Sequence, residues 1–404
     1  MNVNQDKVPL KIPLRFVLLI PFVLVIIVTV SVAGYFNFVN GQKAVTNVAQ
    51  QLSSEVSSRI EQHLNNFLTA PLQVNQLNAT SMRQGLLNPQ NTKEMQNFFL
   101  EQVNTHETIT SIYFGNVEGG IVGSGREGAD GSFYVYDTEK LKAGTFNKYA
   151  ITSEGEMVEL LLSLPNFDAR TRLWYIGANQ KENTTWSAIY ILFTGQDMAL
   201  SVSTPVYDSQ QNLLGVVSVD VFLSQIENYL RALDISKTGQ SFIIERSGLL
   251  VASSTGEKPF VENNGEMERL DARNSQSPMI KYAAEFLRER FGENYDVTNK
   301  EQFEFEINGE PYSLNVSPIN DQYGINWLSV VVIPKSDFMA GITATNRSTF
   351  LITILALGGA ILASIFIADK IASRISTLNE STRAFTRGEE TGLIPANSRI
   401  TEID

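Results

Sequence analysis

Residues 166–175 read Asn-Phe-Asp-Ala-Arg-Thr-Arg-Leu-Trp-Tyr, and this stretch is the most informative part of the sequence. In an extended segment, side chains two positions apart face the same way, so Arg172 and Trp174 are expected to share one side and Tyr175 to face the other. A guanidinium beside aromatic rings suits a small carboxylate, because the planar fork binds it bidentately and the rings exclude water. An arginine stacked on tryptophan only for stability would give the same pattern.

Strand-like segments lie on both sides of this stretch. The runs 110–115, 121–122 and 132–136 precede it, and 186–193, 198–207 and 213–222 follow with turns at Gly195-Gln196 and 208–212. The last three predict an antiparallel meander, followed by a helix over 223–233.

A smaller set of elements comes next. It comprises a hairpin over 241–252, a helix over 277–291, strands over 302–307 and 313–316 joined by Asn308-Gly309, and a strand over 327–332. Asn-Gly between two such runs is a strong hairpin signal. The expected fold class is therefore α+β, with two modules in series.

Residues 123–128 spell Gly-Ser-Gly-Arg-Glu-Gly, the pattern of a dinucleotide-binding loop. That mechanism requires a helix directly after the loop, whereas a strand-like run over 132–136 follows here. We therefore interpret the segment as a loop at a sheet edge.

Two runs without any charged residue, 16–38 and 348–368, are long enough to cross a bilayer as helices. Lysines and arginines gather outside them, at Lys7, Lys11, Arg15, Lys370, Arg374, Arg383 and Arg387. By the positive-inside rule both termini are expected in the cytoplasm and residues 39–347 outside it. Apolar residues recur at spacings of three and four from Val45 to Leu68, which predicts a long amphipathic helix directly after the first span.

Composition excludes several classes of function. The 404 residues carry a net charge of −12, which argues against a nucleic-acid partner. There is no cysteine, so disulfides, thiolate metal sites and cysteine catalysis are excluded. With only two histidines, His63 and His106, we expect no metal site and no cofactor.

The long helix after an anchor, the 166–175 stretch, Trp-Ser-Ala-Ile-Tyr at 186–190, Ser-Thr-Pro-Val-Tyr-Asp at 203–208 and Gly-Val-Val-Ser-Val-Asp-Val at 215–221 together resemble the double Cache sensor domain of bacterial receptors. Residues 239–253, Gly-Gln-Ser-Phe-Ile-Ile-Glu-Arg-Ser-Gly-Leu-Leu-Val-Ala-Ser, are similar to the opening of a second Cache module. The resemblance implies a stalk helix and membrane-distal ligand module over 39–233, and a membrane-proximal module over 234–347.

The amino-acid-binding subset of that family has an Arg-x-Trp-Tyr motif and a downstream aspartate. Carried onto this chain, the resemblance implies that Arg172 and Trp174, with help from Tyr175, hold a ligand carboxylate and that Asp220 takes an ammonium group. Tyr190 is expected in the pocket wall. Phe167 stands where the subset has a tyrosine, which removes one hydroxyl from the ligand site and leaves other small organic ligands open.

After the second span, Ile371, Ile375, Leu378, Thr382 and Phe385 are spaced four, three, four, three, as in a coiled-coil seam. Gly388 is expected to end the helix, and Gly392 to Pro395 to form a connector before a second helix begins near Ile400. Residues 369–404 thus resemble a truncated HAMP linker, although a generic juxtamembrane coiled coil would share the spacing. The seam implies a homodimer.

These observations predict a plasma-membrane receptor for a small ligand, an amino acid being favoured. It would relay binding through HAMP to an output domain beyond residue 404, namely a histidine kinase, a nucleotide cyclase or a chemotaxis signalling helix. Two alternatives remain: a tethered ectoenzyme, for which no catalytic residues stand out, and a structural ectodomain that binds no ligand.

Overall fold

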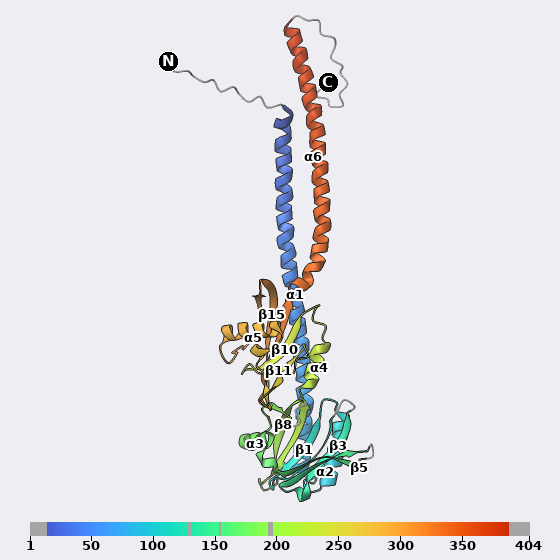
Figure 1. The fold of residues 1–404 in the computed structure, drawn as a ribbon, viewed down its shortest axis with the longest axis vertical. Helices are drawn as coiled ribbons and strands as arrows, with labels where there is room; N and C mark the ends of the chain where they lie inside the picture. Colours follow the sequence, from blue (N-terminus) through green and yellow to red (C-terminus); the bar gives the residue numbers. More distant parts are fainter. Residues whose placement is uncertain (1–13, 128–130, 153–154, 193–196, 388–404) are drawn as a thin grey trace, which may run out of the picture. The chain divides into compact units, whose positions relative to one another are not determined.

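The computed structural model describes residues 14–127, 131–152, 155–192 and 197–387 (Figure 1). The expected features at Gly128, at Gly195-Gln196 and from Gly388 onward lie outside these residues. The chain divides into two compact units, one comprising residues up to Val45 together with those from Phe338, and the other Thr46–Asp337.

The first unit is formed by parts of two long helices, α1 (Leu14–Arg83) and α6 (Ser336–Thr386). Each contains a stretch long and apolar enough to cross a membrane, within Val23–Arg83 and Leu351–Ala384. Almost none of either stretch is buried inside the structure, whereas the core helix of a soluble protein would be covered. The predicted spans 16–38 and 348–368 both fall within these helices, and the amphipathic helix predicted after the first span is continuous with it.

The second unit contains a nine-stranded sheet in the order β5-β4-β3-β2-β1-β9-β8-β6, with β7 paired to β8 (Figure 1). Its strands are β1 (Ser111–Asn116), β2 (Ile121–Glu127), β3 (Ser132–Thr138), β4 (Gly144–Ile151), β5 (Met157–Phe167), β6 (Thr185–Trp186), β7 (Tyr190–Ile191), β8 (Met198–Tyr207) and β9 (Leu213–Phe222). In the predicted meander, the runs 198–207 and 213–222 form β8 and β9 as expected, whereas the run predicted over 186–193 forms only the two-residue strands β6 and β7, which both pair with β8. Strands β4 and β5 were not predicted, and burial along β5 is irregular because this strand forms the sheet edge.

One face of this sheet packs on helices. The Asn75 side chain of α1 accepts a hydrogen bond from the Thr204 hydroxyl of β8, and Ser124 of β2 donates to the carbonyl of Gln96 in α2 (Thr92–Thr105). Side chains alternate along each strand, so the next residues point to the opposite face. That opposite face holds the candidate site.

The interpretation of 123–128 as an edge loop was wrong for its first five residues. Gly123 and Gly125 lie inside β2, which pairs with β1 on one side and β3 on the other. A Cβ atom on Gly123 would come within 2.6 Å of the Tyr136 ring, so glycine is needed because a tyrosine lies across it. A pair of glycines can indicate a strand that a neighbouring side chain approaches closely, and not only a loop.

A five-stranded sheet follows, in the order β11-β10-β16-β15-β14. Its strands are β10 (Gln240–Glu245), β11 (Leu250–Ser253), β14 (Glu301–Ile307), β15 (Glu310–Asn320) and β16 (Asn326–Pro334), and a separate ribbon is made by β12 (Phe260–Asn263) and β13 (Glu266–Arg269). The hairpin predicted at Asn308-Gly309 is confirmed, with φ of 52° and 81° at its two turn residues.

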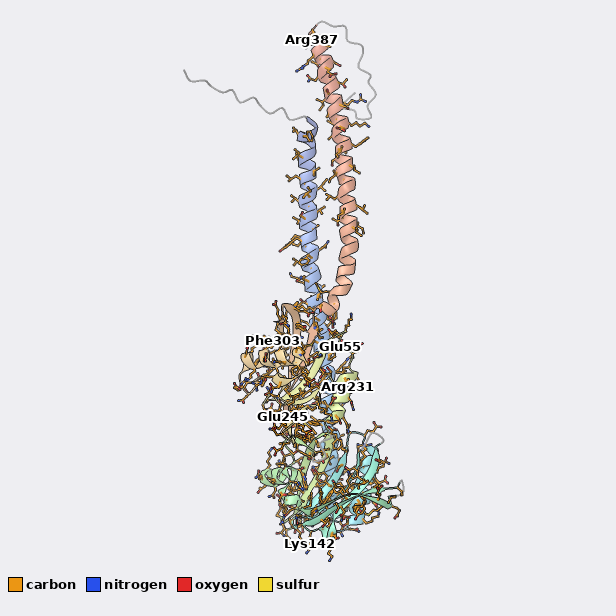
Figure 2. The ribbon with its side chains drawn as sticks, viewed as in Figure 1. Glu55, Lys142, Arg231, Glu245, Phe303 and Arg387 are labelled. Carbon is orange, nitrogen blue, oxygen red and sulfur yellow. The ribbon has the colours of Figure 1, made fainter. Side chains whose placement is uncertain are left out.

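Helix α5 (Pro278–Phe291) covers the five-stranded sheet, and Ser277 accepts a hydrogen bond from the amide of Ile280 as its N-cap. Side chains such as Phe242, Leu287 and Tyr295 fill the core of this part of the unit. A charged pair at its margin joins Arg269 to Glu245, whose place is marked in Figure 2. Helix α4 (Ser224–Ala232) connects the two sheets along the chain.

Candidate ligand-binding site

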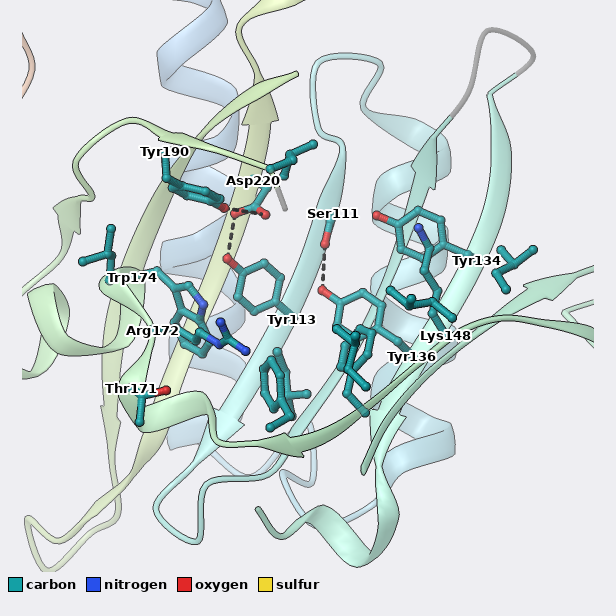
Figure 3. Close-up of a pocket in the computed structure, with 18 of the residues that line it drawn as sticks. Ser111, Tyr113, Tyr134, Tyr136, Lys148, Thr171, Arg172, Trp174, Tyr190 and Asp220 are labelled. Carbon is teal, nitrogen blue, oxygen red and sulfur yellow. Dashed lines mark hydrogen bonds between the residues drawn. The ribbon is translucent and has the colours of Figure 1, made fainter. Parts of the chain in front are cut away.

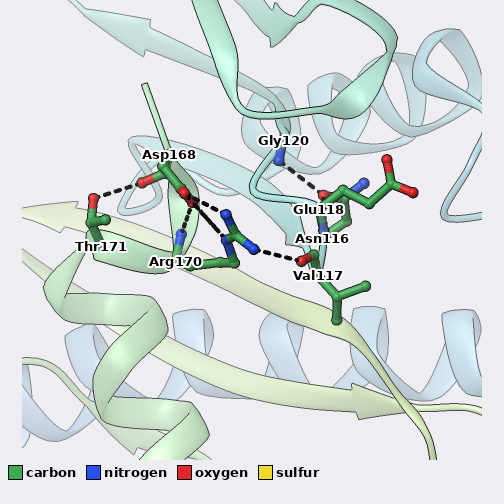
Figure 4. A network of polar contacts seen from close by, with 7 residues as sticks. All are labelled: Asn116, Val117, Glu118, Gly120, Asp168, Arg170 and Thr171. Carbon is green, nitrogen blue, oxygen red and sulfur yellow. Dashed lines mark hydrogen bonds and ion pairs between the residues drawn. The ribbon is translucent and has the colours of Figure 1, made fainter. Parts of the chain in front are cut away.

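A tight turn presents Arg172 and Trp174. Asp168 accepts hydrogen bonds from the backbone and the guanidinium of Arg170, and Thr171 donates to the Asp168 carbonyl at 2.8 Å (Figure 4). Arg170 also donates to the carbonyl of Val117, which ties the turn to the β1–β2 connection. These hydrogen bonds fix the short helix Ala169–Thr171, which directly precedes the Arg-x-Trp-Tyr motif.

Arg172 is the N-cap residue of α3 (Leu173–Lys181), with extended backbone angles of φ −86° and ψ 143°. The extended geometry expected for the motif stops there, because Trp174 and Tyr175 occupy the first helical turn. Successive residues on a helix diverge by about 100°. Trp174 lies edge-on to Tyr113 at 4.8 Å between ring centroids.

Tyr175 does not line the cavity that holds Trp174. It lies instead in a separate hollow with Val117, Arg170 and Asn179. The expectation that Tyr175 assists at the carboxylate position is not supported by this placement. The physical reason is the helical turn, which rotates Tyr175 away from its neighbour.

The cavity has a volume of about 480 Å³ and is formed by the free face of the nine-stranded sheet together with the turn into α3 (Figure 3). Small-molecule sites commonly occupy roughly 300–1,000 Å³. Five residues expected at a ligand site line this cavity: Phe167, Arg172, Trp174, Tyr190 and Asp220. The cavity therefore gathers residues from three separate parts of the chain.

Asp220 lies at one end of the cavity and is 9% exposed. Its Oδ1 accepts hydrogen bonds from the Tyr113 hydroxyl at 2.7 Å and from Ser201 Oγ at 2.6 Å. Its Oδ2 accepts one from the Tyr190 hydroxyl at 3.1 Å. A carboxylate offers about four lone-pair positions, so these three bonds leave about one available.

Burial raises the pKa of Asp220 to about 6, although its three hydroxyl donors oppose this rise. Burial and the nearby Asp220 charge raise the pKa of Tyr113 and of Tyr190 well above the ordinary value for a phenol. Both phenols therefore remain protonated and act as donors at neutral pH. The result is an anionic site that is desolvated and held in place.

Arg172 contributes a cation to the same cavity. Its guanidinium lies over the Phe167 ring at 4.5 Å, so the residue that replaces the expected tyrosine supports the arginine by a cation–π contact. In the described ranges, no hydrogen bond or ion pair joins Arg172 to Asp220 or to another side chain. The two opposite charges thus share a cavity without neutralising each other.

Several residues of the site were not predicted from the sequence. They are Tyr113, Ser111, Tyr134, Tyr136 and Lys148 in the cavity wall, and Ser201 beneath Asp220. The signal was a period of two, since Ser111 and Tyr113, Tyr134 and Tyr136, and Phe146 and Lys148 each share one face of a strand. Gly123 and Gly125 provide the space into which the tyrosines of β3 fit.

Within the described part of the chain, no group of three or more His, Asp or Glu side chains is arranged to hold a metal ion. The chemistry of the cavity is that of recognition: one buried carboxylate, several phenols, an exposed guanidinium and aromatic walls.

Comparisons with known proteins identify the family. Over 240 residues the chain is 20% identical to the methyl-accepting chemotaxis protein PctB of Pseudomonas aeruginosa, covering 59% of this chain and 34% of PctB. Over 227 residues it is 24% identical to the methyl-accepting chemotaxis protein McpC of Bacillus subtilis, covering 56% of this chain and 30% of McpC. The alignments thus span about a third of the length of these curated relatives.

Among solved structures, the ligand-binding domain of the P. aeruginosa PAO1 amino acid chemoreceptor PctC in complex with GABA is similar at 18% identity and a TM-score of 0.44, over 71% of this chain and 99% of that one. The ligand-binding domain of PctB in complex with L-Arg is similar at 16% identity and a TM-score of 0.42, over 72% and 95%. The sequence model of the Cache domain matches residues 41–342, which is more than half of the chain. This chain therefore belongs to the Cache domain family.

Proposed function

We propose that this protein is a membrane receptor that senses a small extracytoplasmic ligand, with an amino acid as the favoured class, in the cavity between Arg172 and Asp220. The observation that carries the proposal is the pair of opposite charges, which share one cavity but do not pair with each other. Asp220 is buried, and a buried charge without a charged partner costs free energy, so a ligand ammonium group is favoured there, while the exposed Arg172 can bind an anionic group of the same ligand.

The available lone pair of Asp220 would accept a hydrogen bond from a ligand ammonium group. Arg172, stacked on Phe167, would bind the ligand carboxylate through two parallel N–H donors. Trp174 and Tyr113 would enclose the ligand between these two ends and exclude water from it. A zwitterion meets these requirements with both of its charges paired.

The remaining architecture is part of the same proposal. Residues 16–38 and 348–368 would span the plasma membrane, with 1–15 and 369–404 in the cytoplasm and 39–347 outside. Residues 39–233 would be the membrane-distal ligand module and 234–347 the membrane-proximal module. Homology to methyl-accepting chemotaxis proteins supports a sensory role. The candidate output domains are a chemotaxis signalling helix, a histidine kinase and a nucleotide cyclase.

Relay toward the cytoplasm would use the direct succession of β16 and α6, which are separated by Lys335 alone. Asp337 in the first turn of α6 accepts hydrogen bonds from Ser236 and Thr238, which fixes the helix start to the segment after α4. In the single chain, Ile375 and Leu378 of the proposed HAMP seam are 47% and 49% exposed. Exposed apolar seam residues support a homodimer, in which a second copy would cover them.

Thermal-shift screening of the full chain in lipid nanodiscs against amino acids, amines, carboxylates and purines tests the proposal. A ligand at 100 times its Kd stabilises the folded state by about 2.7 kcal/mol. The shift should occur with an amino acid and disappear in Arg172→Ala and Asp220→Asn. A shift that survives both substitutions, or no shift with any amino acid, would contradict the proposed site. An ectodomain without a ligand would respond to none of the compounds.

A further inference from the structure

Aromatic rings from five elements, α3, β1, β3, β4 and β5, form a continuous arc along the cavity wall. The distances between successive ring centroids are 4.8 Å for Trp174 and Tyr113, 6.3 Å for Tyr113 and Tyr136, 5.1 Å for Tyr136 and Phe146, and 5.2 Å for Phe146 and Phe167. All five rings line the cavity. The arc therefore runs from Trp174 to Phe167, whose ring lies under the Arg172 guanidinium.

Strand β5 adds aliphatic side chains to this aromatic arc. Leu162 and Leu164 line the cavity and are partly buried against the same cluster of rings. Because β5 forms the edge of the nine-stranded sheet, only β4 pairs with it. The leucines thus present apolar surface to the cavity, and an apolar ligand group that covers this surface gains free energy by removing it from water.

The hydroxyl groups along the arc already have partners. Tyr113 donates to Asp220 at 2.7 Å, and the Tyr136 and Ser111 hydroxyls share a hydrogen bond of 2.8 Å (Figure 3). The second pair keeps one proton that a ligand could accept, whereas a side-chain amide or carboxylate needs several partners when it leaves water. A polar ligand side chain would therefore lose hydrogen bonds to water without full replacement, which costs free energy.

The positions of the two charged groups direct the ligand side chain toward this apolar region. Figure 3 shows Arg172 and Asp220 on one side of Tyr113, and Tyr136 on the other. We infer that the ligand of this receptor is an amino acid with a bulky apolar side chain, aliphatic or aromatic, which packs on the arc and on Leu162 and Leu164. This inference rests on the proposed function and adds the class of the side chain.

A simpler explanation is that these side chains only form the hydrophobic core of this face of the sheet. Two leucines of β5 separate the explanations. Leu162 lines the cavity, whereas Leu160 is 50% exposed and does not line it. Leu160→Asn therefore makes the same chemical change on the same strand as Leu162→Asn, but away from the candidate site.

The experiment is isothermal titration of the full chain in nanodiscs with L-leucine, L-phenylalanine, L-asparagine, L-glutamate and L-alanine. Leucine and asparagine have side chains of nearly equal shape, and glutamate is included because Lys148 also lines the cavity. The wild type should bind L-leucine or L-phenylalanine about tenfold or more tightly than L-asparagine and L-glutamate.

The Leu162→Asn variant should lose most of this preference. Its affinity for L-alanine should stay within about twofold of the wild-type value, because alanine has no side chain beyond Cβ and would be held by its charged groups. Leu160→Asn should bind all five compounds as the wild type does.

The failures are distinguishable. If L-asparagine or L-glutamate binds as tightly as the apolar amino acids, or if Leu162→Asn keeps the preference, this inference is overturned and the amino-acid site stands. If other amino acids bind through Arg172 and Asp220 while L-leucine and L-phenylalanine do not, the apolar class is likewise overturned. If no amino acid binds at all, the proposed function fails and this inference fails with it.

Discussion

Tyr113 and Asp220 lie on the neighbouring antiparallel strands β1 and β9, and the Tyr113 hydroxyl donates a 2.7 Å hydrogen bond to the buried carboxylate. Tyr113 also packs against Trp174. Its side chain therefore contacts both Trp174 and Asp220, two residues from sequence motifs that lie in distant parts of the chain. The site depends on this contact, because it places the aromatic wall and the anion against each other.

Tyr113→Phe should raise the pKa of Asp220 further above about 6, since a donor that favours the ionised form is removed. Ligand affinity at pH 7 should fall, and the pH at which binding is half-maximal should rise. Titrations between pH 5 and 8 measure both quantities. Tyr136→Phe is the control for the pH shift, because Tyr136 lines the same cavity but bonds to Ser111 rather than to Asp220. An equal shift in the pH of half-maximal binding for the two substitutions would contradict the role assigned to Tyr113.

The pH dependence of stability provides a second prediction. Because the folded-state pKa of Asp220 is raised, the folded state binds a proton more tightly than the unfolded chain. The Asp220 contribution therefore destabilises the fold above about pH 6 and disappears below the unfolded pKa near 4. As the pH rises from the lower to the upper limit, the free energy of unfolding of Asp220→Asn should increase by roughly 3 kcal/mol relative to that of the wild type.

Urea unfolding of both proteins at pH 4 and pH 7 measures that difference. Other carboxyl groups make stability depend on pH in the opposite direction. For example, the hydrogen bonds from Arg273 hold the pKa of Asp271 below its usual range. Comparing Asp220→Asn with the wild type at each pH removes these shared contributions. A difference that does not change with pH would show that the buried carboxyl is not the source.

Arg172→Ala and Arg170→Ala should separate binding from support of the turn. Arg172 is exposed and makes its contact with Phe167, so its loss should cost less than about 1 kcal/mol of stability but remove the ligand-induced shift. Arg170 holds Asp168 and the Val117 carbonyl, so its loss should lower stability and weaken binding only indirectly. Melting temperatures with and without ligand distinguish them. The reverse pattern would contradict the assignment.

Gly123→Ala should be costly because its Cβ would meet the Tyr136 ring and the Tyr113 Cβ, each at 2.6 Å. Overpacking of this kind costs about 1–3 kcal/mol and should displace the two tyrosines from the cavity. Gly177→Ala in α3 is the matched control, since its nearest atom would be 4.0 Å away. This change should stabilise α3 by up to about 1 kcal/mol. Chemical denaturation of both variants tests the contrast.

Two hydrogen bonds connect the nine-stranded sheet to the part of the chain that contains the five-stranded sheet. Trp186 donates its indole N–H to Asp321 at 2.8 Å and its backbone amide to the Tyr323 carbonyl at 3.0 Å. Trp186→Phe should remove the side-chain bond at a cost of about 1.5–3 kcal/mol, because the acceptor is charged. A double-mutant cycle with Asp321→Asn should show coupling above about 0.5 kcal/mol. Strictly additive effects would mean that the bond contributes nothing.

Much of the fold could be predicted from local patterns. The helix after the first span, the strands β8 and β9, the Asn308-Gly309 hairpin and α5 follow from periodicity and turn residues. Strand β5 was missed because an edge strand exposes side chains on both faces and loses its alternation, and β4, which lies between β3 and β5, was missed because it is only half-buried along most of its length and shows no alternation either. The glycines of β2 were misinterpreted because the tyrosines that require them lie on other strands, which the local sequence does not show.

Spacing along single segments was enough to predict the two apolar helices, the α+β elements and the Arg172–Trp174 motif. The folded sheet was needed to show that Tyr113, Ser201 and Tyr190 surround Asp220, that Tyr175 turns away, and that Lys148 borders the same cavity. Strand order brings these side chains together across more than 100 residues of chain, as in the pair Tyr113 and Asp220. Burial is a property of that assembled face, and it is burial that raises the pKa of Asp220.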